Sequence, residues 1–295
     1  MTPSPLRLWL VAARPRTLPA ALAPVLVGTA LAGSEDVFKP VRFACALVVS
    51  VFIQIGTNLA NDYSDARRGA DTEDRLGPVR VTAGGLMPPR RVLTGTWVAF
   101  GIAFAAGLYL VAVAGWELLL VGLASIAAGA LYTGGPRPYG YEGLGEIFVF
   151  LFFGVVAVVG SYYVQVEELP WEAFALSVPV GLIAAGILVV NNVRDVDTDR
   201  RAGKNTLAVR IGRARAVRLY AAMLGLALVA PVAIAAAGGL SWWLLLALAS
   251  APLVPPLVRT VATRTDGASL NGALAGTGRL LAVYSVLLGA GILLS

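Results

Sequence analysis

Residues 43–75 read FACALVVSVFIQIGTNLANDYSDARRGADTEDR, and the change in character halfway along this stretch decides how the chain is organised. The first half is apolar and predicts a membrane-spanning helix over 42–61, because about 20 apolar residues are needed to cross the hydrocarbon core. The second half holds five carboxylates and three arginines. Acids at the C-terminal end of a helix meet the negative end of its dipole, so this group needs positive partners.

The composition is that of a membrane protein. Hydrophobic residues make up 58% of the chain and charged residues 14%, whereas about a quarter of the residues of a soluble domain are charged. Histidine is absent and Cys45 is the single cysteine, which excludes an internal disulfide, a Ser-His-Asp triad and most zinc sites. The net charge of +6 is distributed as expected for a protein at a membrane surface, and no nucleic-acid partner is predicted.

Nine apolar segments cover nearly the whole chain. We therefore predict an all-α integral membrane protein with a single transmembrane domain over 1–295. Its helices are expected at 16–33, 42–61, 92–114, 116–133, 144–164, 173–193, 216–237, 240–258 and 273–294. The first segment is basic at its start, like a signal peptide, but it carries three prolines and no convincing cleavage site, so we interpret it as an uncleaved span.

The basic residues indicate the orientation of these helices. With a cytoplasmic N-terminus, 20 of the 23 lysines and arginines fall in cytoplasmic segments, as the positive-inside rule requires. The loops at 62–91 and 194–215 are long and rich in both signs of charge, whereas the external loops are short. We expect these two loops to cap a functional site that faces the cytoplasm, in a multi-pass protein of the plasma membrane.

A second acidic motif repeats the spacing of the first. NLAND at 58–62 and NNVRD at 191–195 are both Asn-x-x-x-Asp at the cytoplasmic end of an apolar helix, and each is followed by a further aspartate. Residues three or four apart share a helical face, so the side chains of each motif converge. The converging residues are Asn58, Asp62 and Asp65 in the first motif, and Asn191, Asp195 and Asp199 in the second.

Two groups of oxygen ligands without histidine or cysteine suit Mg²⁺, which is usually held by a few carboxylates together with substrate phosphates. Two aspartate clusters among arginines and lysines would therefore suit a metal-bridged diphosphate. The alternative is that both loops carry only Asp–Arg ion pairs that anchor lipid headgroups.

Four stretches resemble a known family: NDYSDARRGADTEDRLGPVR (61–80), YTGGPRPYGYEGLGE (132–146), FVFLFFG (148–154) and NNVRDVDTDRRAGKNTLAVRIG (191–212). They are similar to the motifs of the UbiA superfamily of intramembrane aromatic prenyltransferases. Within it they are most similar to the branch that prenylates 1,4-dihydroxy-2-naphthoate in menaquinone synthesis. The resemblance implies nine transmembrane helices around a central cavity. It also implies Mg²⁺ as cofactor, with a polyprenyl diphosphate and 1,4-dihydroxy-2-naphthoate as substrates and membrane lipid as surroundings.

The resemblance also assigns residues. The two motifs above would bind metal, with Asp62, Asp195 and Lys204 in catalytic roles. The diphosphate and substrate contacts implied are Arg16 (or Arg14), Arg67, Tyr132, Arg137 and Lys204. Relatives often extend the first motif with a third aspartate, but here that position is Gly69, and Asp71 or Asp74 is the possible substitute. Asp71, Glu73 and Asp74 are otherwise expected to shape the cap.

The implied reaction is an electrophilic aromatic substitution, in which the allylic C–O bond ionises and the ring attacks at its carboxylate-bearing carbon before losing CO₂. Two alternatives remain. The first alternative is a prenyltransferase that uses a different aromatic acceptor. The second is a secondary transporter, which would place polar groups deep within the spans. A CDP-alcohol phosphotransferase would also use aspartates and metal, but its characteristic acidic pattern is absent from the sequence.

Overall fold

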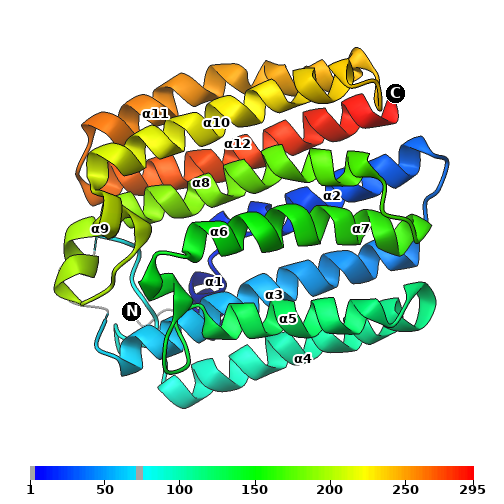
Figure 1. The fold of residues 1–295 in the computed structure, drawn as a ribbon. Coiled ribbons are helices and arrows are strands. Elements are labelled where there is room, and N and C mark those ends of the chain that lie inside the picture. The colour runs from blue at the N-terminus through cyan, green and yellow to red at the C-terminus, as the bar shows by residue number, and fades with distance from the viewer. Residues whose placement is uncertain (1–3, 71–75) are drawn as a thin grey trace.

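The computed structural model describes residues 4–70 and 76–295, and these residues form helices and connecting loops without any strand (Figure 1). The long helices run side by side. Their order is α1 (Pro5–Ala13), η1 (Pro15–Thr17), α2 (Pro19–Ser34), α3 (Pro40–Arg67), α4 (Pro89–Ala114), α5 (Glu117–Leu131), η2 (Tyr139–Glu142), α6 (Gly145–Val149), η3 (Phe150–Val156), α7 (Ala157–Val166), α8 (Trp171–Arg201), α9 (Leu207–Ile211), α10 (Arg213–Ala236), η4 (Trp242–Leu253), α11 (Val254–Thr263) and α12 (Gly267–Leu293).

Each of the nine predicted segments is helical, but the number of spans differs from the prediction. Among the described residues, seven helices are long and apolar enough to cross a membrane: α3, α4, α6 to α7, α8, α10, η4 to α11, and α12. The pair formed by α1–η1 and α2 adds an eighth if it counts as one span, although it bends by 54°. Helix α5 has only 15 residues. Length and composition therefore support a multi-pass protein with seven or eight spans, and the ninth depends on α5.

The predicted loops at 62–91 and 194–215 are shorter than expected, because the helices before them continue. Helix α3 runs to Arg67 and has 28 residues, and α8 runs to Arg201 and has 31. Both exceed the roughly 20 residues that span the hydrocarbon, so their polar ends project beyond it as regular helix. Part of the second loop also folds as the short helix α9.

Proline and capping residues set where the long helices begin. Proline is the first residue of α2, α3 and α4, a position where its missing N–H costs no hydrogen bond. The side chain of Asp266 accepts a hydrogen bond from Ser269 N at 2.8 Å and so caps the start of α12. The sequence thus marks several helix starts locally.

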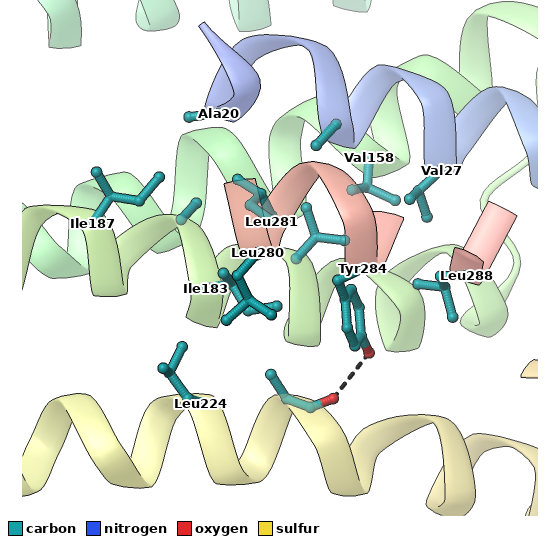
Figure 2. Close-up of a cluster of buried hydrophobic side chains, with 14 of the residues drawn as sticks. Ala20, Val27, Val158, Ile183, Ile187, Leu224, Leu280, Leu281, Tyr284 and Leu288 are labelled. Carbon is teal, nitrogen blue, oxygen red and sulfur yellow. Dashed lines mark hydrogen bonds between the residues drawn. The ribbon is translucent and has the colours of Figure 1, made fainter. Parts of the chain in front are cut away.

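The main core lies where α2, α8, α10 and α12 meet (Figure 2). Its side chains are mostly small or branched and apolar. Tyr284 of α12 is fully buried there, and its hydroxyl donates to the carbonyl of Ala227 in α10 at 2.9 Å. This bond satisfies the one polar atom that the tyrosine brings into the core, so the ring adds packing without a desolvated hydroxyl.

Glycine allows η3 and α8 to approach closely. A Cβ built on Gly154 would lie 2.7 Å from the Cα of Gly181, closer than real side chains come. Small residues at such a crossing let two backbones pack within a membrane, where dispersion rather than the hydrophobic effect drives helix association. The crossing fixes η3, a stretch of π-helix, as one wall of the central cavity.

One end of the bundle collects the polar segments. Helices α3, α5 and α8 end there, α4, α6, α10 and α12 begin there, and α1 and α9 lie beside them, at the left of Figure 1. We call this the polar end. It holds both Asn-x-x-x-Asp motifs, so the fold brings together two sequences that are 133 residues apart.

Candidate active site

A cavity of about 330 Å³ lies between the helices and extends to the polar end. Its walls come from α2, α3, α4, α5, η3, α7 and α8. Carboxylates, amides and basic groups line it near the polar end, including Asp65, Asp195 and Lys204. Apolar side chains such as Val25, Leu110 and Val164 line the opposite part. The cavity therefore suits a molecule with an anionic head and an apolar tail.

Asp65 has three polar partners in the cavity wall. Its carboxylate is 2% exposed, accepts a hydrogen bond from the Tyr141 hydroxyl at 2.7 Å, and lies 3.3 Å from Lys204 Nζ and 3.4 Å from Arg80 Nη2. Lys204 also sits over the Tyr141 ring, 4.8 Å from its centroid. Two cations therefore contact one carboxylate here, and both line the cavity that an anionic ligand would enter.

The first motif does not converge as predicted. Asp62 lies outside the cavity wall, and its two carboxylate oxygens accept hydrogen bonds from Val81 N at 3.1 Å and Thr82 N at 2.9 Å. Asp62 thus anchors the loop before α4. Asn61 lines the cavity instead, one helical turn before Asp65, and its Oδ1 accepts a hydrogen bond from the Thr133 hydroxyl at 3.0 Å. Consecutive helical residues point about 100° apart, which is why Asn61 and Asp62 face different surroundings.

Asn58 does line the cavity, but its amide is engaged elsewhere. Its Nδ2 donates to the carbonyl of Ala13 at 3.0 Å and to the Thr17 hydroxyl at 3.2 Å. These bonds fasten α3 to the bend before α2. Asn58 therefore stabilises the wall of the cavity, and Asn61 is the amide that sequence reasoning missed. The signal for it was the i, i+4 spacing to Asp65.

The second motif converges as predicted, around an arginine that was not predicted. Asn191, Asp195 and Asp199 all line the cavity. Arg194 is 4% exposed and donates to both oxygens of Asp195, to Asn191 Oδ1 at 2.8 Å, and to Asn271 Oδ1 of α12 at 2.7 Å. The positive partner that acids at a helix end require is thus supplied from within the motif.

The donor set fits a hard divalent cation. Asp65 and Asn61 on α3 face the same cavity as Asn191, Asp195 and Asp199 on α8, and all supply oxygen atoms. No group of three or more acidic, histidine or cysteine side chains is already gathered into one cage in the parts of the chain that the structure describes. Mg²⁺ is usually held by few carboxylates together with substrate phosphates, so this partial set suits it.

The basic residues form two groups, those that line the cavity and those that do not reach it. Arg14, Arg80 and Lys204 line the cavity, so the structure favours Arg14 over the predicted Arg16, which is exposed. Arg14 has a left-handed backbone, with φ of 53°, which turns its side chain toward the carbonyl of Asn58 at 3.4 Å. Arg80, missed by sequence reasoning, arrives on the loop that Asp62 anchors.

The predicted contacts Arg67 and Arg137 do not reach the cavity. Arg67 is exposed and donates to the Tyr63 hydroxyl on the outer side of α3, at 3.0 Å, and Arg137 is exposed in the loop after α5. Asp71, Glu73 and Asp74, the predicted cap residues, lie outside the described residues. Gly69, where relatives often have aspartate, follows the end of α3 with a positive φ of 63°. A chain reversal there suits glycine and leaves no helical face for a ligand.

Aromatic rings line the cavity beside the polar groups. Tyr139 stacks on Phe148 with centroids 3.9 Å apart, Phe148 is 6.1 Å from Phe152, and Tyr132 meets Tyr139 edge-on at 5.4 Å. Burial raises the pKa of the Tyr139 hydroxyl, which therefore stays protonated at neutral pH. The predicted substrate contact Tyr132 is thus one member of an aromatic row.

Comparison with known proteins identifies relatives over the full length. A model described as the UbiA prenyltransferase family matches residues 21–271. A Mycobacterium tuberculosis protein named 1,4-dihydroxy-2-naphthoate octaprenyltransferase is 42% identical over 94% of this chain and 94% of its own length. An Escherichia coli protein of the same name is 39% identical over 97% of this chain and 95% of its own.

Solved structures share the fold at lower identity. A UbiA homolog from Archaeoglobus fulgidus bound to GPP and Mg²⁺ aligns with a TM-score of 0.67 at 16% identity, over 98% of this chain and 100% of that chain. The apo structure of a UbiA homolog from Aeropyrum pernix K1 aligns with a TM-score of 0.69 at 19% identity, over 94% of this chain and 96% of that chain. The helical bundle around the cavity is therefore a known architecture.

Proposed function

The chain belongs to the UbiA prenyltransferase family, and on this premise we propose that it transfers a polyprenyl group from a polyprenyl diphosphate to 1,4-dihydroxy-2-naphthoate with loss of CO₂, giving demethylmenaquinol. The observation that carries the reaction class is one cavity with two acidic clusters, basic side chains and an apolar extension. The acceptor is supported by 39–42% identity, over nearly the whole chain, to relatives named as 1,4-dihydroxy-2-naphthoate octaprenyltransferases.

The residues that would hold Mg²⁺ differ in part from those predicted. The set that lines the cavity with oxygen donors is Asn61, Asp65, Asn191, Asp195 and Asp199. When bound, Mg²⁺ would neutralise the diphosphate and so favour its departure. Asp62 would support this set indirectly, because it holds the loop that carries Arg80. That loop would form part of a cap over the polar end.

Basic side chains stabilise the leaving group. The allylic C–O bond breaks with its electron pair going to the diphosphate, so negative charge grows on the bridging oxygen. Lys204 and Arg80 already lie within 3.4 Å of Asp65 and face the cavity, where they would exchange part of that contact for the diphosphate. Cations aimed at developing charge in a largely buried site give the strongest stabilisation of a transition state.

The aromatic row protects and orients the other fragment. Phe148 and Phe152 offer ring faces and no nucleophile to an allylic cation, and the Tyr139 hydroxyl is engaged with the carbonyl of Ala128 at 2.8 Å, so the row would exclude water from the cation. The acceptor ring then attacks the allylic carbon through its carboxylate-bearing carbon. The C–CO₂ bond breaks next and its electron pair restores the aromatic ring. CO₂ leaves in place of a ring proton, so no strong base is required.

We place the site at the cytoplasmic face of the plasma membrane. The polar end carries the basic-rich segments, and a cytoplasmic N-terminus would assign 20 of the 23 lysines and arginines to that side. Nine spans would follow if α5 crosses the membrane as a short span and the bent α1–η1 and α2 pair counts as one.

The apolar part of the cavity would hold the polyprenyl tail. Gly122 of α5 and Gly160 of α7 both line it, and a Cβ on either would meet nothing within 4 Å. Val121 of α5 lines the cavity, and this residue is also 39% exposed. This combination favours a tail that runs between α5 and α7 and continues into the lipid.

Purified protein in lipid nanodiscs tests the proposal directly. With Mg²⁺, octaprenyl diphosphate and 1,4-dihydroxy-2-naphthoate, mass spectrometry of the lipid extract should detect demethylmenaquinol, and EDTA should abolish it. A parallel reaction with 4-hydroxybenzoate tests the alternative that another aromatic acceptor is used. Product from 4-hydroxybenzoate alone would refute the acceptor, and undiminished turnover in EDTA would refute the metal.

A further inference from the structure

Glu146 is a buried acid that the reaction above does not use. It is the second residue of α6 and is 3% exposed. Its Oε1 accepts a hydrogen bond from Asn192 Nδ2 of α8 at 2.8 Å. Its Oε2 is buried and has no hydrogen-bond partner in the described part of the chain. A carboxylate oxygen kept inside a protein at this cost is unusual and commonly marks a functional site.

The contact with Glu146 determines which way the Asn192 amide points. A carboxylate only accepts hydrogen bonds, so the NH₂ end of the amide faces Glu146 and the carbonyl end faces away. Asn192 lines the cavity, and its Oδ1 receives no hydrogen bond from the described residues. The cavity therefore meets a hydrogen-bond acceptor at this position, suited to a ligand that donates, such as a hydroxyl.

The surroundings of Asn192 suit an aromatic ligand. Glu146 lies two residues before Phe148, which stacks with Tyr139 in the cavity wall. Asn192 directly follows Asn191 of the second acidic motif. Asn192 therefore lines the same cavity as the aromatic row and the groups that would bind the diphosphate, and an acceptor ring must lie in this cavity to reach the allylic carbon.

We propose that Asn192, oriented by Glu146, recognises the aromatic acceptor by accepting a hydrogen bond from the acceptor's 4-hydroxyl. This inference rests on the proposed function and names its acceptor subsite. The carbon that bears the carboxylate must lie near the cations around Asp65, because it attacks the allylic carbon beside the diphosphate. The 4-hydroxyl is the hydroxyl remote from that carboxylate. Glu146 is a positioning residue, because it acts through Asn192.

The test compares variants and acceptors together. Asn192→Leu keeps the approximate size of the side chain and removes the carbonyl, whereas Glu146→Gln keeps the shape and removes the fixed orientation of the amide. Ser250→Ala is the control, because it removes a buried polar group whose hydroxyl bonds to Ala247 O at 2.7 Å, away from the cavity. Each protein is assayed with 1,4-dihydroxy-2-naphthoate and with its 1-methyl and 4-methyl ethers, and its melting temperature is recorded.

We expect wild-type protein to lose about tenfold in kcat/KM with the 4-methyl ether relative to the 1-methyl ether, the effect of one lost hydrogen bond. Asn192→Leu should raise the KM for the acceptor about tenfold and abolish the difference between the ethers. The KM for the diphosphate should stay within about twofold, and Ser250→Ala should match wild type. A purely structural role would not produce this split between substrates.

Three results would overturn the inference. The first is equal use of both ethers by wild-type protein, a measurement that needs no variant. The second is an Asn192→Leu protein that retains both the wild-type acceptor KM and the discrimination between the ethers. If Asn192→Leu does not fold, an unchanged acceptor KM in Glu146→Gln would be equally decisive. Failure of wild-type protein to prenylate 1,4-dihydroxy-2-naphthoate at all would instead refute the proposed function, and this inference with it.

Discussion

Arg194 holds the carboxylate of its neighbour Asp195 with two hydrogen bonds, Nε to Oδ1 at 2.8 Å and Nη2 to Oδ2 at 2.5 Å. The same guanidinium reaches Asn191 and Asn271, and it lies behind the cavity wall. It therefore fixes the second motif from behind while Asp195 faces the cavity. Asn271 continues the contact by donating to the carbonyl of Leu76 in the loop before α4, at 3.0 Å.

Replacing Arg194 should therefore damage both stability and turnover. Arg194→Ala leaves the buried Asp195 carboxylate without its partner and should lower the free energy of unfolding by about 3–5 kcal/mol. Arg194→Lys keeps the charge but loses the planar fork, so we expect a fall in prenylation of about tenfold in a protein that still folds. Chemical unfolding and a product assay measure the two effects.

The matched control is Arg200→Ala on the same helix. Its side chain is 60% exposed and pairs with Asp197 at 3.7 Å, so its loss should cost less than about 1 kcal/mol and leave turnover unchanged. Wild-type activity in Arg194→Lys would contradict the positioning role.

Asp62 and Asp65 should respond differently to the same conservative change. Asp65→Asn should raise the Mg²⁺ concentration for half-maximal activity by at least about tenfold, because it alters a proposed ligand. Asp62→Asn should leave that concentration within about twofold, since Asp62 accepts from the backbone of Val81 and Thr82. It should instead speed tryptic cleavage after Arg80 by loosening the loop.

Asp197→Asn provides the control for both measurements, because the Asp197 side chain is 78% exposed outside the cavity. An equal rise in the Mg²⁺ requirement for Asp62→Asn and Asp65→Asn would restore the sequence-based assignment of Asp62 as a ligand.

This difference shows what the sequence could predict and what it could not. Apolar length predicted the helices, and the repeated Asn-x-x-x-Asp spacing predicted that Asp65 and Asp195 would share a site. Spacing alone does not fix the rotation of α3 about its axis, which packing against its neighbours sets. The sequence analysis therefore assigned Asp62 to the site, whereas Asn61 is the residue that lines the cavity.

Loop paths are a second quantity that local patterns do not contain. Arg80 reaches the cavity because the loop before α4 is held by Asp62 and Asn271, through contacts that span 19, 20 and 195 positions of the chain. Arg14 turns inward through a left-handed backbone that no motif announces. By sequence, Arg80 is an ordinary positive-inside arginine and Arg14 is only the alternative to Arg16, so tertiary contacts are needed to separate both from Arg67 and Arg137.

The contact between Arg42 and Glu167 lets us predict how acidic pH affects the stability of the fold, at the end of the bundle opposite the polar end. Arg42 donates to Glu167 Oε1 at 2.6 Å, to Val164 O at 2.9 Å and to Val113 O at 2.8 Å, so it joins α3, α4 and α7. The hydrogen bond from Arg42 holds the pKa of Glu167 below its ordinary value of 4.5. A carboxyl group with a lowered pKa stabilises the fold above its unfolded pKa, and this contribution is lost as the pH falls through the folded pKa.

Glu167→Gln should therefore melt at a lower temperature than wild type at pH 7, and the difference should shrink as the pH is lowered below 4.5. The neighbouring exposed acid supplies the control: Glu168→Gln, measured in the same detergent, should not show this narrowing. A gap between wild type and Glu167→Gln that stays constant down to pH 3 would rule out the linkage.

Gly160 should set the length of tail that the enzyme accepts. It lines the apolar part of the cavity, and open space surrounds the position of a Cβ. Gly160→Phe should fill that space, so kcat/KM for octaprenyl diphosphate should fall by about tenfold or more, while kcat/KM for geranyl diphosphate should fall by less than about threefold.

Gly101→Phe on α4 is the control, because Gly101 has the same open surroundings but does not line the cavity. Equal losses with both donors would place the tail elsewhere, and an effect of Gly101→Phe equal to that of Gly160→Phe would show that added bulk, not the route, is responsible.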